Sequence, residues 1–358
     1  MCVLGRIIII IIIKGEKMKN IILSTTSLFL ISTTASFAQS PLTLSGEVDL
    51  WGSYTSLDGA SYQEEFQTDA EFDARFEMAE DGLTYGANVG AEIDDNNDFA
   101  IDEMYGFVGM GAASVKFGKT EGAANAFSNL PTTDLGLLSN GDYESILGNV
   151  PMNSLHEINN SGKSEKVVLG YDVDALSVAV SYTPEFAYGV GTYENAVEAS
   201  ANYVVHMDGL HLGVNGTIGS AKGVGLEDYT TWKIGANASV SGVDLGVDYM
   251  NGDKFGIATG GVEDDNKTVT LGAGYNLTEK TYVAGNYAMA FGDKLAGGTG
   301  NYSDSMNVLG VGVTHSFAPN WSVGSDVYYA VDKASDTIGG TQTEMDNLSI
   351  VFGTKLSF

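Results

Sequence analysis

The sequence predicts an all-β protein whose strands close into a sixteen-stranded antiparallel transmembrane β-barrel. Three observations lead to this fold: side chains alternate between apolar and polar with a period of two, the alternating segments number sixteen, and their connections are short and long in turn. An even number of strands, with tight turns at one end and long loops at the other, is typical of bacterial transmembrane barrels.

The clearest alternation covers residues 66–78. One face carries Phe66, Thr68, Ala70, Phe72, Ala74, Phe76 and Met78, and the other carries Gln67, Asp69, Glu71, Asp73, Arg75 and Glu77. Successive side chains of a strand point to opposite faces, so this segment has one apolar and one charged face. Residues 346–358 repeat the pattern. A closed sheet with lipid outside and water inside satisfies both faces and leaves no unpaired backbone edge.

The predicted strands span residues 42–54, 66–78, 83–93, 100–109, 114–119, 165–172, 176–183, 196–205, 210–219, 229–240, 243–250, 268–276, 281–291, 306–317, 321–331 and 346–358. Short, periplasmic turns are expected at 79–82, 110–113, 173–175, 206–209, 241–242, 277–280 and 318–320, and long outer loops at 55–65, 120–164, 253–267, 292–305 and 332–345. Aromatic side chains near the strand ends suit interfacial girdles, as at Tyr54, Tyr105, Tyr182, Tyr275, Tyr282, Phe317, Trp321 and Phe358.

The amino-terminal 38 residues are expected to be absent from the mature protein. Met18 opens a basic region, residues 21–31 are mostly apolar, and Ser36 and Ala38 occupy the −3 and −1 positions of a cleavage site. Residues 18–38 therefore have the layout of a signal peptide, with cleavage before Gln39. Residues 1–17 fit no part of it and are interpreted as a mis-assigned upstream start, or alternatively as a longer signal region. Residues 39–358 then form one barrel domain.

The charge of the remaining 320 residues limits the possible partners. The whole chain has 46 acidic and 17 basic residues; one acid and four bases precede residue 39, which leaves 45 and 13 and a net charge of −32. Nucleic-acid binding is excluded because a phosphate backbone requires a basic surface. The only cysteine, Cys2, lies in the removed part, so disulfides cannot stabilise the mature chain.

Four features together resemble the general porin family of Gram-negative bacteria, particularly the acidic porins of alphaproteobacteria. They are the opening strand at 42–48, residues 73–76, the hairpin formed by 103–109 and 114–119, and the terminal Phe358. The resemblance implies a homotrimer of sixteen-stranded barrels in the outer membrane, in contact with lipid and lipopolysaccharide. It also implies that Phe358 is a signal read by the barrel-assembly machinery, and we expect it to matter for assembly more than for packing.

The same resemblance implies that the third loop, residues 120–164, folds into the pore and narrows it. Loop acids would then face basic residues of the wall. The acids are Asp134, Asp142 and Glu144, and the basic residues are Arg75, Lys119, Lys163 and Lys166. Alternatively, Arg75 forms an ordinary lumen salt bridge and the acids are solvated loop charges. Lys116, Lys233 and Lys355 are interpreted as wall lining.

The chain departs from the family on the fourth strand, where Asp102 and Glu103 stand in place of a wall arginine. Together with the net charge, this predicts a channel that passes ions and small hydrophilic solutes passively and prefers cations. No cofactor is expected. Asp94, Asp95 and Asp98 could bind calcium weakly, although their segment lacks the glycine and closing glutamate of an EF-hand loop.

Three other functions remain open from the sequence: a substrate-specific channel, an outer-membrane hydrolase and a soluble secreted β-protein. A hydrolase would need a base beside its nucleophile. The four histidines are His156, His206, His211 and His315, and none stands in a familiar catalytic motif. His206 and His211 bracket a predicted periplasmic turn, where a polar residue needs no special role.

Overall fold

The computed structural model describes residues 41–57, 63–93, 99–123, 165–188, 191–224, 228–253, 265–292, 302–335 and 342–358. Almost all of them are β-strand, and no helix among them is long and apolar enough to cross a membrane. The strands are β1 (Leu42–Leu57), β2 (Gln63–Glu80), β3 (Leu83–Ile93), β4 (Phe99–Met110), β5 (Ala113–Lys119), β6 (Glu165–Val173), β7 (Leu176–Thr183), β8 (Phe186–Tyr188), β9 (Gly191–Met207), β10 (Leu210–Gly223), β11 (Tyr229–Val240), β12 (Val243–Asp253), β13 (Asp265–Thr278), β14 (Thr281–Gly292), β15 (Tyr302–Ala318), β16 (Trp321–Ser335) and β17 (Gln342–Ser357).

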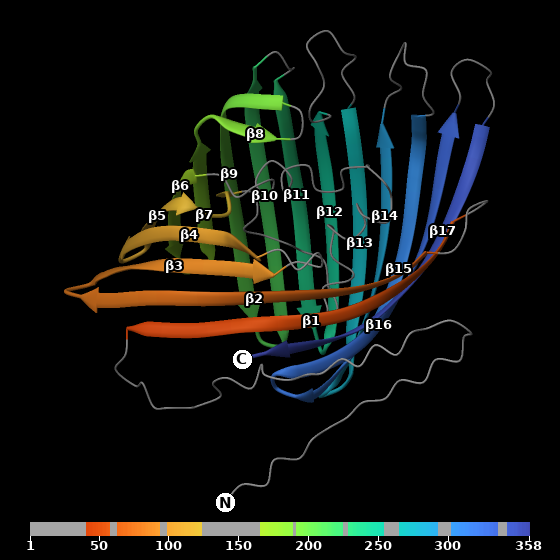
Figure 1. Ribbon diagram of the computed structural model, residues 1–358, viewed down its shortest axis with the longest axis horizontal. Helices are drawn as coiled ribbons and strands as arrows, with labels where there is room; N and C mark the ends of the chain where they lie inside the picture. The colour runs from red at the N-terminus through yellow and green to blue at the C-terminus, as the bar shows by residue number, and fades with distance from the viewer. Residues whose placement is uncertain are drawn as a thin grey trace, which may run out of the picture. The chain divides into compact units, whose positions relative to one another are not determined.

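The sheet is closed, because the first and last strands pair with each other. Strand β1 is antiparallel both to β2 and to β17, and the ladder with β17 runs from Glu47 opposite Ser357 to Leu57 opposite Asn347 (Figure 1). Beyond the ladder, Gly46 N donates to Phe358 O at 3.1 Å and Phe358 N donates to Gly46 O at 2.9 Å. Closure therefore satisfies the backbone groups of both edge strands, as a membrane requires.

The barrel has sixteen strand positions although it contains seventeen strand segments. Strand β7 pairs with β9 up to Thr183 opposite Ala196, and β8 pairs with the same strand from Phe186 opposite Tyr193. Pro184 lies between β7 and β8 and has no backbone N–H to continue the ladder. Segments β7 and β8 thus form one interrupted strand, and the predicted antiparallel sixteen-stranded barrel is confirmed.

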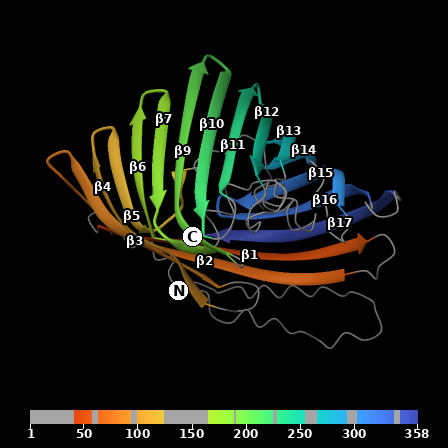
Figure 2. The same ribbon diagram turned by 90° about the horizontal axis from the view of Figure 1, so that it is seen from above.

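All seven short turns lie where the sequence predicts them, at 81–82, 111–112, 174–175, 208–209, 241–242, 279–280 and 319–320. The turns at Asp81-Gly82 and Ser241-Gly242 have positive φ at both central residues, with values of 51° and 80° in the first and 51° and 81° in the second. Such turns match the right-handed twist of the flanking strands, and glycine adopts their second position without strain. Figure 2 shows several of these tight hairpins, including β6–β7 and β9–β10.

The strands extend further toward the long loops than predicted. Strand β1 reaches Leu57 rather than residue 54, β15 begins at Tyr302 rather than 306, and β17 begins at Gln342 rather than 346. The strands are longer than predicted because a backbone ladder can continue beyond the apolar band of the membrane. Hydrophobic alternation marks only the part of each strand that lies against lipid.

The two faces of β17 divide as expected. On β17, Leu348, Ile350 and Phe352 are exposed on the outer face, whereas Ser349 and Val351 are buried on the inner face. The girdle assignment is wrong at two positions. Tyr105 is buried, and Tyr282 has the parity of buried Ala284 and Asn286, so both lie on the inner side. Proximity to a strand end does not define the face of a side chain. The face depends on parity, that is, on whether the residue number is odd or even along the strand.

Candidate pore-wall site

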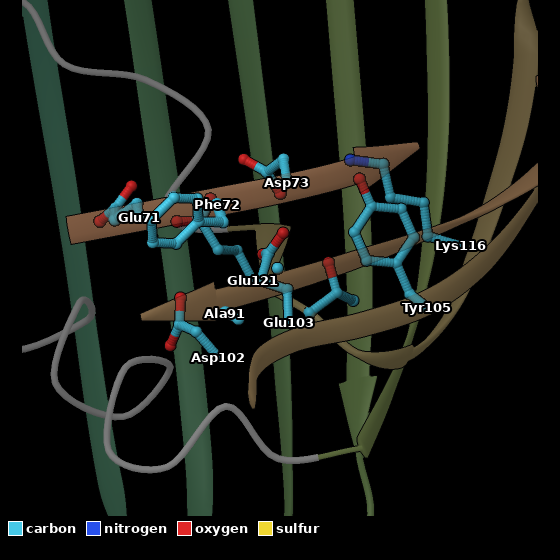
Figure 3. A pocket seen from close by; sticks show the side chains of 11 residues that line it. Glu71, Phe72, Asp73, Ala91, Asp102, Glu103, Tyr105, Lys116 and Glu121 are labelled. Atoms are coloured by element: carbon cyan, nitrogen blue, oxygen red, sulfur yellow. The ribbon is translucent and has the colours of Figure 1, made fainter. Parts of the chain in front are cut away.

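A cavity of about 360 Å³ lies against the inner wall formed by β2, β3, β4 and β5. Its acidic lining residues are Glu71, Asp73, Asp102, Glu103 and Glu121, and its other lining residues are Phe72, Gly90, Ala91, Tyr105, Lys116 and Thr120. Figure 3 shows Lys116 and Tyr105 together at one end of the cavity and Glu71 and Asp102 at the other. We refer to this space as the acidic cavity.

A β-bulge brings two consecutive acids into the acidic cavity. Gly90 of β3 lies opposite Glu103, but the next residue, Ala91, lies opposite Ile101, so Asp102 is the extra residue of the ladder. In a regular strand, Asp102 and Glu103 would point to opposite faces. An inserted residue re-aims the side chains next to it, and here both carboxylates line the same space.

Strict alternation misses this bulge, yet the sequence contains a signal for it. Phe99 and Ile101 are exposed on the outer face at 68% and 45%, and so is Met104 at 54%. The apolar residues therefore change from odd to even numbers between Ile101 and Met104. Such a change of parity within one strand requires one unpaired residue, and Asp102 or Glu103 is the candidate.

The acidic cavity contains more acidic than basic side chains. Asp73 accepts a hydrogen bond from Asn88 Nδ2 at 3.1 Å, which fixes that carboxylate against the wall. The ammonium of Lys116 lies 5.3 Å from the centre of the Tyr105 ring, a distance suited to a cation–π contact. Five carboxyl groups against one ammonium attract cations, particularly where low-dielectric walls concentrate the field.

Arg75 points to the inner side, as its parity predicts, but its charge has a close partner. Its Nε and Nη2 both donate to Glu77 Oε2, at 3.0 and 2.7 Å. The guanidinium also lies 4.3 Å from the centre of the Phe107 ring. The alternative interpretation of Arg75 as a lumen salt bridge agrees with this geometry. An exposed pair of this kind contributes little stability, and Glu77 offsets most of its field.

The structure does not bring Lys119 into the acidic cavity. Lys119 pairs in the ladder with Met104, which is exposed on the outer face, and its Nζ donates to the carbonyl of Ile101. The backbone is irregular just before it, since Gly118 has a φ of 127°. The basic residue in the cavity is Lys116, which the sequence suggested only as ordinary wall lining.

Buried hydrogen bonds join residues 120–123, the described start of the 120–164 segment, to the barrel wall. Lys166, only 2% exposed, donates from Nζ to Thr120 O at 3.1 Å. Ala123 N donates to Ser181 Oγ at 2.9 Å, and Ser181 Oγ donates to Glu198 Oε2 at 2.7 Å. Lys166 thus positions the start of the loop. Ser181 and Glu198 were not expected from the sequence, because their contacts join segments far apart in the chain.

The remaining predicted site residues lie outside the described residues: Lys163, Asp134, Asp142 and Glu144 of the loop, and the calcium candidates Asp94, Asp95 and Asp98. Across the described parts of the barrel, no group of three or more histidine, cysteine, aspartate or glutamate side chains is arranged to hold a metal ion.

The terminal Phe358 packs with one face against β1 and β2. Its ring centre lies 5.9 Å from that of Phe72, and a Cβ at Gly46 would lie 2.8 Å from the Phe358 ring. Closure of the sheet thus places one face of the Phe358 ring over a glycine of the first strand, while 46% of the residue stays exposed. Its role as an assembly signal stays a prediction.

Comparisons with known proteins agree with this fold. The family model described as Gram-negative porin matches residues 24–337. The anion-selective porin of Comamonas acidovorans has a TM-score of 0.64 at 13% identity, over 88% of this chain and 99% of that one. The trimer form of Vibrio cholerae OmpT has a TM-score of 0.58 at 14% identity, over 88% and 99%. A mutant of the Rh. blastica porin has a TM-score of 0.57 at 14% identity, over 88% and 100%. A search of curated protein sequences finds no match.

Proposed function

Because the chain belongs to the Gram-negative porin family, we propose that this outer-membrane channel passes ions and small hydrophilic solutes by passive diffusion and prefers cations. Family and fold indicate a channel rather than an enzyme. Diffusion through a water-filled lumen requires no catalytic group, so selectivity depends on the charges and the width that the wall presents.

The acidic cavity is the observation that supports a preference for cations. The bulge adds Asp102 to an inner surface that already carries Glu103, Asp73 and Glu71. The basic charge that would oppose them is reduced, because Arg75 is paired with Glu77. The lumen wall therefore offers a path along which cations gain favourable electrostatic energy.

A homotrimer is part of the same proposal. Trimer forms occur among the structurally similar porins, as the Vibrio cholerae protein shows. The outer surface of the barrel carries exposed apolar side chains on most strands, which suits contact with lipid, with lipopolysaccharide and with neighbouring barrels.

Zero-current potentials across a planar bilayer test the selectivity. The purified full-length channel is placed in a dilute potassium chloride gradient. We expect the zero-current potential to have the sign that corresponds to a preference for potassium over chloride. The preference should weaken as salt rises, because the screening length falls from about 10 Å at 0.1 M to about 3 Å at 1 M. A chloride preference would contradict the proposal, and an absence of conductance steps would contradict the channel itself.

A further inference from the structure

Two histidines meet on the hairpin of β9 and β10, next to its two-residue turn at Asp208-Gly209. His206 lies directly opposite His211 in the ladder, one pair beyond the closing pair Met207 and Leu210. Their Nδ1 atoms are 2.5 Å apart, and the ring centres are 4.7 Å apart in an edge-to-face arrangement. Both side chains are exposed, so the pair is accessible to solutes at the short-turn end of the barrel.

Parity places both rings on the inner side of the wall. His206 has the parity of Glu198 and Ser200, which are buried on the inner face of β9, and His211 has the parity of Asn215 and Thr217 on β10. Opposite residues of an antiparallel pair have Cβ atoms only about 5 Å apart, which allows two imidazoles to converge on one point. The ladder between β7 and β9 ends at Tyr203, three residues before His206, so the pair lies beyond that ladder at the mouth of the lumen.

We propose that His206 and His211 form a two-imidazole binding site for a borderline transition-metal dication, of the class of Cu²⁺, Ni²⁺ and Zn²⁺. Imidazole nitrogen is a preferred ligand of these ions, and Cu²⁺ is bound most tightly of the first-row dications. Water molecules would complete the coordination, which keeps the site open and exchangeable. The site is distinct from the acidic cavity, whose oxygen ligands suit harder cations.

Small movements of the two rings are sufficient for binding. Metal–nitrogen distances of about 2.0–2.1 Å place two ligands of one ion about 3 Å apart, so the present 2.5 Å contact must open slightly. In the neutral pair, one Nδ1 carries the shared proton. That ring moves its proton to Nε2, both Nδ1 lone pairs then face the metal, and no proton is lost overall. Because both rings are exposed, these rotations meet little resistance.

Copper titration of the detergent-solubilised full chain, followed by calorimetry and electron paramagnetic resonance, tests the site. We expect one equivalent of Cu²⁺ with two imidazole nitrogens in its spectrum, bound more tightly than Ni²⁺ or Zn²⁺. His206→Ala and His211→Asn should each weaken binding by about tenfold or more, because either change removes the intramolecular second ligand. The double variant removes both imidazoles and should bind Cu²⁺ more weakly than either single variant.

Two matched controls identify the ligands. His315→Ala removes a histidine that contacts Thr281 on another part of the barrel, and His156→Ala removes the fourth histidine. Both should bind Cu²⁺ as the wild type does, and all variants should keep the heat-dependent gel migration of a folded barrel. Unchanged binding in His206→Ala or His211→Asn, or an equal loss in His315→Ala, would overturn the proposal.

Discussion

The walls formed by β2–β5 and by β13–β15 differ in both regularity and charge. The first contains the bulge at Asp102, the positive φ of Gly118 and most of the side chains around the acidic cavity. In the membrane-facing part of the second, the ladders are unbroken. Its buried inner residues are neutral and mostly small, namely Thr268, Thr270, Gly274, Ala284, Asn286, Ala288, Val308, Gly310, Gly312 and Thr314.

This difference shows where the barrel departs from its repetitive pattern. A regular ladder needs only side chains that alternate between apolar and polar. Small neutral residues on the inner face leave room for solutes without creating an electrostatic field. The irregular wall gathers adjacent acids that alternation alone would separate. The selectivity of the channel should therefore depend on one side of the lumen, whereas the integrity of the barrel depends on both.

Deleting single residues should distinguish the two walls most strongly. Deletion of Asp102 removes the extra residue and restores a regular register between β3 and β4, so the barrel should still fold. Deletion of Tyr287, which pairs with Leu271 and Leu309 in regular stretches of both ladders, shifts the phase of half of β14 and turns apolar side chains inward. Refolding in detergent, followed by heat-dependent gel migration, measures the folded fraction. Equal losses in the two variants would show that the bulge is not a tolerated insertion.

Neutralising the bulge should have the next largest effect, on selectivity rather than on folding. The double variant Asp102→Asn with Glu103→Gln keeps the shapes of both side chains and removes two charges from the acidic cavity. We expect the ratio of potassium to chloride permeability to fall by about twofold to threefold, since fewer wall charges concentrate cations. Asn286→Asp is the matched variant on the neutral wall and should raise the ratio. An unchanged ratio in the double variant would locate the selectivity filter elsewhere.

The Phe358 ring connects the end of the chain to the irregular wall through Phe72. Phe358→Ala should destabilise the refolded barrel by about 1–3 kcal/mol, because it removes the contact with Phe72 and uncovers Gly46. Phe72→Leu weakens the same packing but leaves the terminal residue intact. If Phe358 is also an assembly signal, Phe358→Ala should lower the folded protein in cells more than Phe72→Leu does. Equal losses in cells and in detergent would indicate a packing role alone.

The smallest expected effect is the difference in ion selectivity between substitutions of two basic residues, one on the inner side of β2 and one on the inner side of β5. Lys116→Gln removes the one ammonium that lines the acidic cavity and should increase the cation preference measurably. Arg75→Ala should increase it less and enlarge the conductance slightly, because Glu77 already offsets the arginine. Zero-current potentials in dilute potassium chloride compare the two variants directly. A larger shift for Arg75→Ala would mean that the Arg75–Glu77 pair opens when the channel conducts.

Much of the fold was predictable from the sequence because its causes are local. Alternation assigned the faces of residues 66–78. A polar residue followed by glycine marked the turns at Asp81-Gly82 and Ser241-Gly242. Charge and the change of parity around Asp102 indicate an acidic, irregular fourth strand. The position of Arg75 beside Glu77 also follows from spacing, because residues two apart on a strand share a face.

Only the tertiary structure decided which inner side chains meet. Closure placed Phe358 over Gly46, and the ladder brought Ser181 of β7 and Glu198 of β9 to the start of the loop that follows β5. The same pairing joined His206 to His211, to which the sequence, from their place beside a turn, assigned no special role. A period of two fixes the side of the wall on which a residue lies, but the register between strands fixes its neighbours, because hydrogen-bonded ladders join residues that are distant in the chain.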